Sequence, residues 1–196
     1  MSGTSIESLH ALFQDTLEML SLTWASFRRH DAAALAKAES LGRDVHRREK
    51  ELTQRFLATP SVVDALRFIP AHLERIGDAA EGLIRCLRTM EMEGTVFTDR
   101  GVREISTLFD KAIDIVECAR DLTSTGNRFL ARHLEAESYR FHELADEFAR
   151  AHEERLIEGV CLPRASSVYL AILDYLREIV RHARRVADRF PAAHAR

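Results

Sequence analysis

Apolar residues recur every three or four positions through long stretches of this chain of 196 residues, and few residues interrupt them. Only 8 glycines and 4 prolines are present, so the helix-breaking residues are scarce. A spacing of three and four is typical of amphipathic helices, and no segment alternates as a strand hairpin does. The sequence therefore predicts an all-α protein.

Six long helices can be placed by this periodicity and by helix-end signals. Asp31 is suited to cap the second helix, and the segment 93–98 with Gly94 predicts the clearest linker. The predicted helices run from about Thr4 to Arg29, from Asp31 to Ala58, from Pro60 to Met90, from Arg100 to Thr125, from Asn127 to Gly159, and from Pro163 to Phe190. Pro70 would then lie inside the third helix, where a proline tends to kink the axis.

The two halves of the chain look like copies of one unit. When Pro60 is laid on Pro163, the third helix aligns with the sixth without gaps, and both keep an apolar seam. The seam residues are Val62, Leu66, Ile69, Leu73, Ile76, Ala80, Leu83 and Leu87, and their counterparts Ala165, Tyr169, Ile172, Leu176, Ile179, Ala183, Val186 and Phe190. We expect two tandem three-helix bundles, 1–92 and 99–191, joined by the linker 93–98 and packed as one body.

Composition excludes several classes of protein. The formal net charge of −3 argues against a general nucleic-acid binder. The three cysteines are far apart, which argues against a disulfide framework and fits a reducing cytosol. No run approaches the roughly 20 apolar residues that cross a bilayer, and the first residues lack a signal-peptide pattern. The expected location is the cytoplasm, at most peripheral to a membrane.

Glu74 and Asp78 are four residues apart, so both carboxylates lie on one face of the third predicted helix. Like charges at this spacing repel by a few tenths of a kcal/mol, and a hard cation with oxygen ligands would reverse that repulsion. Two carboxylates do not complete a coordination shell, and Asp44 and Glu49 of the preceding helix are candidates for the remainder. A solvated acidic face is the simpler alternative.

The corresponding face of the sixth predicted helix carries arginine instead of acid. Arg177, Arg181, Arg184 and Arg185 share one side of this helix, and guanidinium groups suit phosphate or carboxylate partners. This face predicts a surface for an acidic partner, an anionic lipid or phosphate. Cations favoured near a helix C-terminus, or pairing with the acidic face of a second subunit in a homodimer, are the alternatives.

The block Leu73-Glu-Arg-Ile-Gly-Asp78 resembles the signature of the PhoU family, whose members repeat a three-helix unit twice and carry a motif of the type Leu-Glu-Arg-Ile-(Gly/Ala)-Asp-His-Ala on the third helix of each unit. Only Leu176, Ile179, His182 and Ala183 of that motif remain in the second half. The resemblance implies a PhoU-like body and a non-enzymatic regulator or accessory of phosphate transport that binds a transporter or a signalling partner. It also implies a divalent or iron-type metal at Glu74 and Asp78.

Two other functions remain as alternatives. One is a helical adaptor with this fold and no role in phosphate transport. The other is a ferritin-like di-iron enzyme, because Glu7 and His10 form an ExxH pair, although such centres need a second ExxH and two further glutamates. No phosphate-binding glycine loop or nucleophile motif is present in the sequence.

Overall fold

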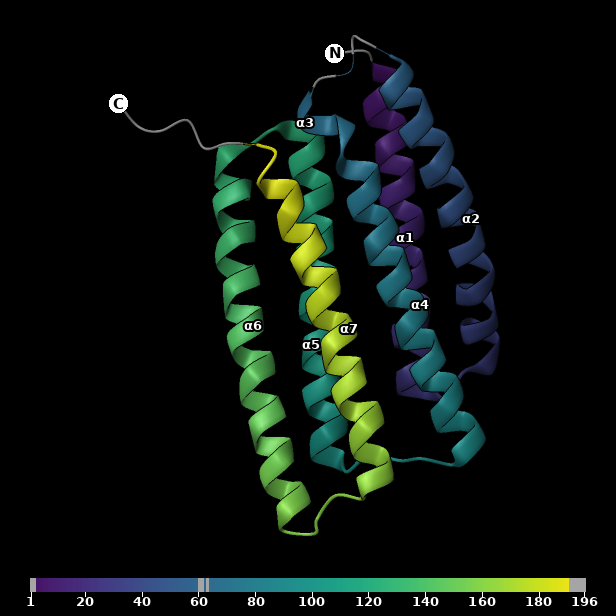
Figure 1. The fold of residues 1–196 in the computed structure, drawn as a ribbon, viewed down its shortest axis with the longest axis vertical. Helices are drawn as coiled ribbons and strands as arrows, with labels where there is room; N and C mark the ends of the chain where they lie inside the picture. The colour runs from purple at the N-terminus through teal and green to yellow at the C-terminus, as the bar shows by residue number, and fades with distance from the viewer. Residues whose placement is uncertain (1–2, 60–61, 63, 191–196) are drawn as a thin grey trace.

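The computed structural model describes residues 3–59, 62 and 64–190, with the side chains of residues 3, 4 and 64 left aside. This part of the chain forms six long helices, one single-turn helix and no strand. The helices are α1 Gly3–Arg29, α2 Ala32–Ala58, α3 Asp64–Arg67, α4 Ile69–Glu93, α5 Asp99–Thr125, α6 Arg128–Ile157 and α7 Pro163–Ala187. The predicted all-α class is confirmed, and Figure 1 shows the long helices side by side along one axis.

The ends of the helices follow local sequence signals. The Asp31 side chain accepts hydrogen bonds from the N–H groups of Ala33 and Ala34 and so caps α2, as predicted. Gly94 and Gly126 end α4 and α5 in the left-handed conformation, with φ of 60° at each, which glycine adopts without steric cost.

The prediction for the third helix was wrong in one respect. The long helix α4 begins at Ile69, which places Pro70 in its first turn, where a missing N–H costs nothing, rather than in a kinked interior. The short helix α3 precedes it as a separate element. The predicted start at Pro60 lies outside the described residues.

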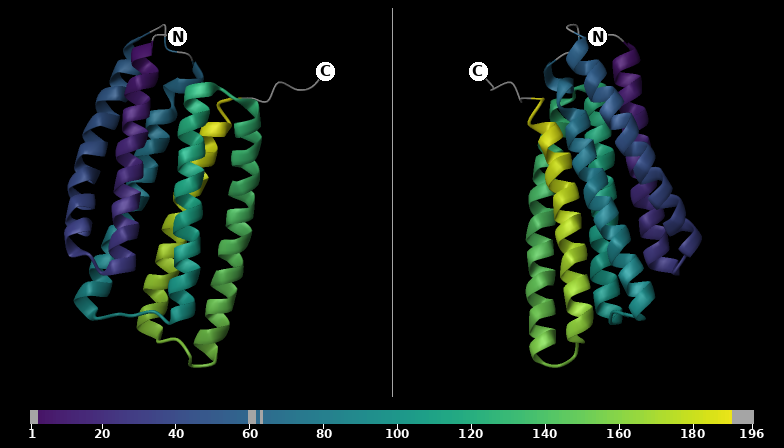
Figure 2. Two further views of the ribbon diagram at one scale, coloured as in Figure 1. Left: turned by 180° about the vertical axis from the view of Figure 1, so that it is seen from behind. Right: turned by 45° about the vertical axis from the view of Figure 1, so that its right-hand side comes forward.

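Each group of three long helices packs together, α1 with α2 and α4, and α5 with α6 and α7. The two groups meet through α4 against α7 and α1 against α5, and Figure 2 shows the same arrangement from two further sides. One continuous core runs through both groups. Every residue of the predicted seam on the first side is buried, and on the second side all but the half-buried Phe190 are.

Two contacts explain how closely the groups approach. A methyl group at Gly82 of α4 would lie 2.3 Å from the ring of Tyr175 of α7, so the absent side chain makes room for that ring. Trp24 of α1 stacks on Phe109 of α5 with ring centroids 5.1 Å apart. No helix of the described part is long and apolar enough to cross a membrane.

Candidate functional site

The acidic turn of α4 faces α2. An oxygen of Asp78 lies 3.4 Å from Nε2 of His46, and an oxygen of Glu81 lies 3.8 Å from the same nitrogen. Arg75 is 3.5 Å from the other oxygen of Asp78. Glu74 is half-buried one turn earlier. The sequence did not single out His46, because a histidine on a polar helix face carries no signal of what lies opposite.

Asp44, the third predicted ligand, accepts a hydrogen bond of 2.8 Å from Arg47 along α2. That hydrogen bond, together with the charge of Arg47, lowers the pKa of the Asp44 carboxyl. Within the described residues no three or more histidine, cysteine, aspartate and glutamate side chains gather closely enough to hold a metal ion. Metal binding by Glu74, Asp78 and Asp44 therefore stays a prediction.

The arginines of α7 are interleaved with carboxylates. Arg177 bridges Asp146 of α6 and Asp174 of its own helix, each at 2.8 Å, and only 18% of its side chain is exposed. Arg181 lies 2.7 Å from Glu178. The other two predicted anion-binding residues are exposed: Arg185 lies 3.2 Å from Asp188, and Arg184 is the fourth arginine of the row.

The arginines of this row affect the pKa of His142 on α6. Burial lowers the pKa of the His142 imidazole, and the positive charges of Arg181 and Arg177 lower it further. The carboxylate of Asp146 acts in the opposite direction and raises that pKa, so the arginines and a carboxylate both act on His142. An anionic group would be attracted most readily to the exposed members, Arg181, Arg184 and Arg185.

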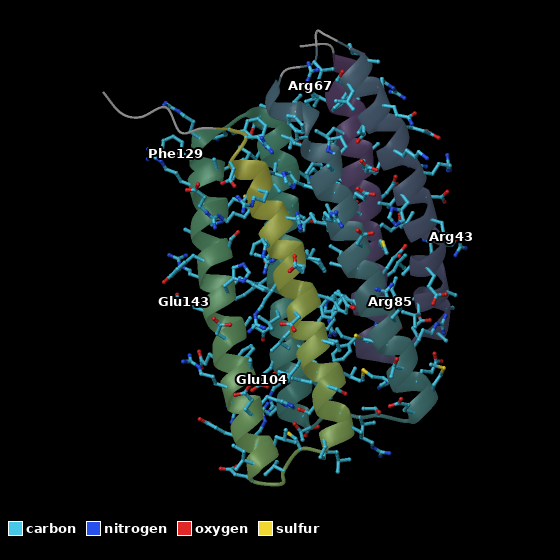
Figure 3. The ribbon with its side chains drawn as sticks, in the orientation of Figure 1. Arg43, Arg67, Arg85, Glu104, Phe129 and Glu143 are labelled. Atoms are coloured by element: carbon cyan, nitrogen blue, oxygen red, sulfur yellow. The ribbon has the colours of Figure 1, made fainter. Side chains whose placement is uncertain are left out.

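A buried polar cluster that the sequence interpretation missed lies where α5, α6 and α7 meet. The carboxylate of Glu104 accepts two hydrogen bonds from Arg155, at 3.0 and 2.6 Å, one from the hydroxyl of Tyr169 at 2.6 Å and one from Arg100 at 2.9 Å. Glu104 is only 5% exposed and Arg155 only 7%. Figure 3 labels Glu104 toward the lower end of the bundle.

The ionisation of this cluster follows from its contacts. Burial alone would raise the pKa of the Glu104 carboxyl, but the hydrogen bonds from Arg155 and Tyr169 outweigh it and hold that pKa below its usual value. Burial and the hydrogen bond to Glu104 raise the pKa of Tyr169. His152 stacks on the Tyr169 ring at 4.1 Å and pairs with Ser166 at 2.8 Å, and burial lowers its pKa.

A carboxylate on an apolar helix face was the available signal for this cluster. Glu104 lies on the same face of α5 as the buried Gly101, Ile105 and Leu108. A charge among core positions needs a buried partner. The sequence does not show which of the arginines on other helices supplies it.

Two histidines meet where α4 packs on α7. The Nδ1 atoms of His72 and His182 are 3.5 Å apart, and Nε2 of His182 lies 3.6 Å from Glu178. Burial, followed by the charges of His182 and Arg189, lowers the pKa of His72 to about 4. The pair contributes to the contact between the two groups of helices in its neutral form.

The ExxH pair shows no comparable environment. Glu7 and His10 are both exposed on α1, and neither is part of a group of metal-binding side chains in the described part of the chain. The structure thus brings together Asp78, Glu81 and His46 on one side, and the α7 arginines with α6 carboxylates on the other.

These features define a class of protein: an all-α body of two mutually packed three-helix groups with charged outer faces. Comparison with solved structures is more specific. The fold is similar to that of PhoU from Pseudomonas aeruginosa, with a TM-score of 0.85 and 18% sequence identity over 95% of this chain and 93% of that chain. The phosphate transport system regulatory protein PhoU from Streptococcus pneumoniae gives a TM-score of 0.83 at 13% identity, covering 95% of this chain and 91% of that one.

A PhoU-like protein from Shewanella oneidensis MR-1 is similar over 94% of this chain and 96% of that chain, with a TM-score of 0.66 and 15% identity. No family model and no curated protein matches the sequence. The chain therefore has a PhoU-like fold, as the resemblance of its motif predicted.

Proposed function

We propose that this protein is a non-enzymatic regulator or accessory protein of phosphate transport, which acts by binding a transporter or a signalling partner. The observation that carries the proposal is the similarity of fold to PhoU, one example of which is described as a phosphate transport system regulatory protein. The Leu73–Asp78 motif on α4 supports it independently, because it is a feature of sequence rather than of shape.

The exposed arginines of α7 are the proposed contact with an anionic group on that partner. Arg181, Arg184 and Arg185 are exposed along one helix, whereas Arg177 is held by Asp146 and Asp174. Guanidinium groups bind carboxylates and phosphates with paired hydrogen bonds. We place the interaction at the cytoplasmic side of the membrane, where a transporter or kinase presents its soluble parts.

The acidic turn is the proposed metal site. Glu74 and Asp78 would supply carboxylate oxygens to a hard divalent or iron-type cation, with Asp44 reaching across from α2 after releasing Arg47. Such a cation would reduce the repulsion between the stacked carboxylates and fix α2 against α4. Asp110 and Asp114 of α5 are exposed at the same i,i+4 spacing and provide a matched control.

The test of the regulatory role combines uptake and partner capture. Deleting the gene should change phosphate uptake, and the tagged protein should co-purify with a phosphate transporter or a kinase that controls it. The variant Arg181→Glu with Arg184→Glu and Arg185→Glu should lose that partner and reproduce the deletion. The control Arg132→Glu with Arg150→Glu, which reverses exposed charges on α6, should retain both.

Unchanged uptake in the deletion strain, with a partner unrelated to transport, would favour an adaptor that shares only the fold.

The metal site is tested separately. Glu74→Ala with Asp78→Ala should abolish the rise in melting temperature caused by excess Mn²⁺, whereas Asp110→Ala with Asp114→Ala should preserve it. A rise of equal size in both variants would leave the acidic turn as a solvated helix face.

A further inference from the structure

The outer face of α6 carries large apolar side chains that are exposed to solvent. α6 packs on α5 and α7 and turns its other side away from both. Phe129 at its start, Tyr139 near its middle and Ile157 at its end are 78%, 66% and 87% exposed. Single exposed apolar residues are common in proteins, so the charges of the face have to decide whether it is a contact surface.

These charges change sign from one end of the helix to the other. Arg128 and Arg132 lie near its start, Glu153 and Glu154 lie near its end, and Glu158 follows directly. All five are exposed, and within the described residues none has a salt-bridge partner. The dipole of a helix favours the opposite distribution, with acidic residues at the start and basic residues at the end. The single chain therefore gains nothing from this order, whereas a partner whose charges run the other way would stabilise it.

A second copy of the chain in antiparallel orientation is such a partner. When two α6 helices pair about Glu143, Arg132 of one copy lies at the level of Glu154 of the other, because both are equally far from Glu143 in the sequence. For the same reason Phe129 of one copy lies at the level of Ile157 of the other. The antiparallel pair thus places opposite charges together and apolar side chains together.

The same pairing accounts for the two exposed exceptions to the charge pattern. Glu135 in the basic half and Arg150 in the acidic half lie at nearly the same level of the pair. A parallel pair would instead bring the basic ends together and the acidic ends together, where they repel. Around a two-fold axis each contact occurs twice, so the antiparallel arrangement is self-complementary and closes as a dimer. The two copies of Glu143 meet near this axis, and their repulsion weakens the contact.

The size of the face sets the strength of such a dimer. α6 has 30 residues and is therefore about 45 Å long, with a diameter of about 10–12 Å. Its outer face offers about 500 Å² in each copy, or about 1,000 Å² in total, which is at the low end for specific interfaces. We expect a weak dimer that depends on protein concentration rather than an obligate one.

We infer that this protein forms an antiparallel dimer in which the outer faces of α6 of two copies pair about a two-fold axis near Glu143. Ion pairs between the basic start of one α6 and the acidic end of the other hold the two copies in register, with Phe129 and Ile157 packed between them. The contact does not involve the acidic turn of α4. This inference does not depend on a role in phosphate transport, and partner capture by the arginines of α7 does not require the dimer.

Charge reversal with mixing of variants tests the pairing. Sedimentation equilibrium of the full chain, at concentrations up to about 0.5 mM, should show monomers and dimers, and salt should weaken the dimer. Arg132→Glu and Glu154→Arg should each weaken the dimer about tenfold or more, because each reverses both copies of one ion pair. Mixing the two variants should restore the dimer, since in the mixed dimer both pairs again join opposite charges. Arg43→Glu is the control, because Arg43 is exposed on α2 across the molecule from the labelled α6 residues in Figure 3.

Two further variants test the apolar contact and the symmetry axis. Phe129→Ala should weaken the dimer about tenfold, since exposed aromatic side chains commonly carry much of an association. Leu57→Ala is its control, because Leu57 is 60% exposed but lies at the end of α2. Glu143→Gln should tighten the dimer about twofold or more by removing the repulsion at the axis.

Several results would overturn the inference. One is a wild-type protein that stays monomeric throughout this concentration range. Another is a mixture of Arg132→Glu and Glu154→Arg that dimerises no better than either variant alone. Equal losses in Phe129→Ala and Leu57→Ala, or a weaker dimer in Glu143→Gln, would exclude this pairing of α6 as well. The substituted side chains are all exposed, so each variant should keep the melting temperature of the wild type.

Discussion

Replacing Glu104 with alanine should destabilise this protein more than any exposed charge replacement. Glu104 accepts four hydrogen bonds, two of them from Arg155, whose side chain is 9% exposed. Removing the carboxylate leaves a guanidinium and a tyrosine hydroxyl buried without an acceptor. Breaking a buried ion pair by removing one partner costs about 3–5 kcal/mol.

The pair Glu178 and Arg181 is the natural control. It is nearly as short, at 2.7 Å, but its side chains are 39% and 54% exposed. Exposed pairs contribute about 0–1 kcal/mol, since water and salt screen them. Glu178→Ala should therefore lower the free energy of unfolding by less than about 1 kcal/mol.

The assay is urea unfolding followed by circular dichroism for wild type, both single variants and the triple variant Glu104→Met with Arg155→Met and Tyr169→Phe. The triple variant removes every buried group of the cluster that would otherwise lose a partner. It should recover most of the stability lost in Glu104→Ala, because replacing a whole buried ion pair with apolar groups is often neutral. If Glu104→Ala costs no more than Glu178→Ala, or if the triple variant is less stable than the single one, the cluster is not the desolvated pair described here.

Three further predictions concern packing, protonation and capping. Gly82→Ala should lower the melting temperature, because the new methyl group would lie 2.3 Å from the Tyr175 ring. In Gly77→Ala the new methyl group would lie 3.4 Å from the Val45 side chain, so this variant should be neutral, or more stable by up to about 1 kcal/mol through helix propensity. Thermal unfolding of both variants tests this. The pKa of the His72 imidazole is lowered to about 4, so the unfolded chain binds a proton at this histidine at higher pH than the folded protein does, and stability should fall by about 1–3 kcal/mol as the pH drops from roughly 6.5 to 4. In urea titrations at several pH values, His72→Gln should reduce this loss of stability. A pH profile of stability that is the same in His72→Gln and wild type would contradict the prediction. Asp31→Ala should cost about 1 kcal/mol in the same titrations because α2 loses its cap, and Asp31→Asn should cost much less.

The fold was predictable from sequence because each of its determinants is local or periodic. The spacing of apolar residues predicted both α4 and α7, and the residues that it assigned to the apolar seam of these helices are buried, apart from the half-buried Phe190. Asp31 marked a helix start by a side chain that satisfies the N–H groups next to it. The start of α4 was predicted wrongly because a proline is acceptable in a first helical turn and this part of the sequence contains two, Pro60 and Pro70, of which Pro70 lies in the first turn of α4.

The polar sites were less predictable, since their partners come from distant parts of the chain. Glu104 and Arg155 are 51 residues apart, and Arg177 and Asp146 are 31 apart. Helical spacing predicts which residues share a face, but it does not predict what that face meets. The predicted arginine row is present on α7, yet its first member, Arg177, already forms an ion pair with Asp146 of α6. No pattern in the sequence connects Asp146 with Arg177.

The same reasoning separates the two charged faces as candidates for function. Asp78 and Glu81 are drawn to His46 across the α2–α4 contact at 3.4 and 3.8 Å, distances that leave these groups only weakly held. Arg177 is fixed by two carboxylates at 2.8 Å. A weakly held carboxylate is available to a cation or a basic partner at little cost, whereas a guanidinium that already bridges two carboxylates must first release them. We therefore expect charge reversal at Asp78 to change partner or metal binding more than charge reversal at Arg177, which should instead weaken the packing of α6 on α7.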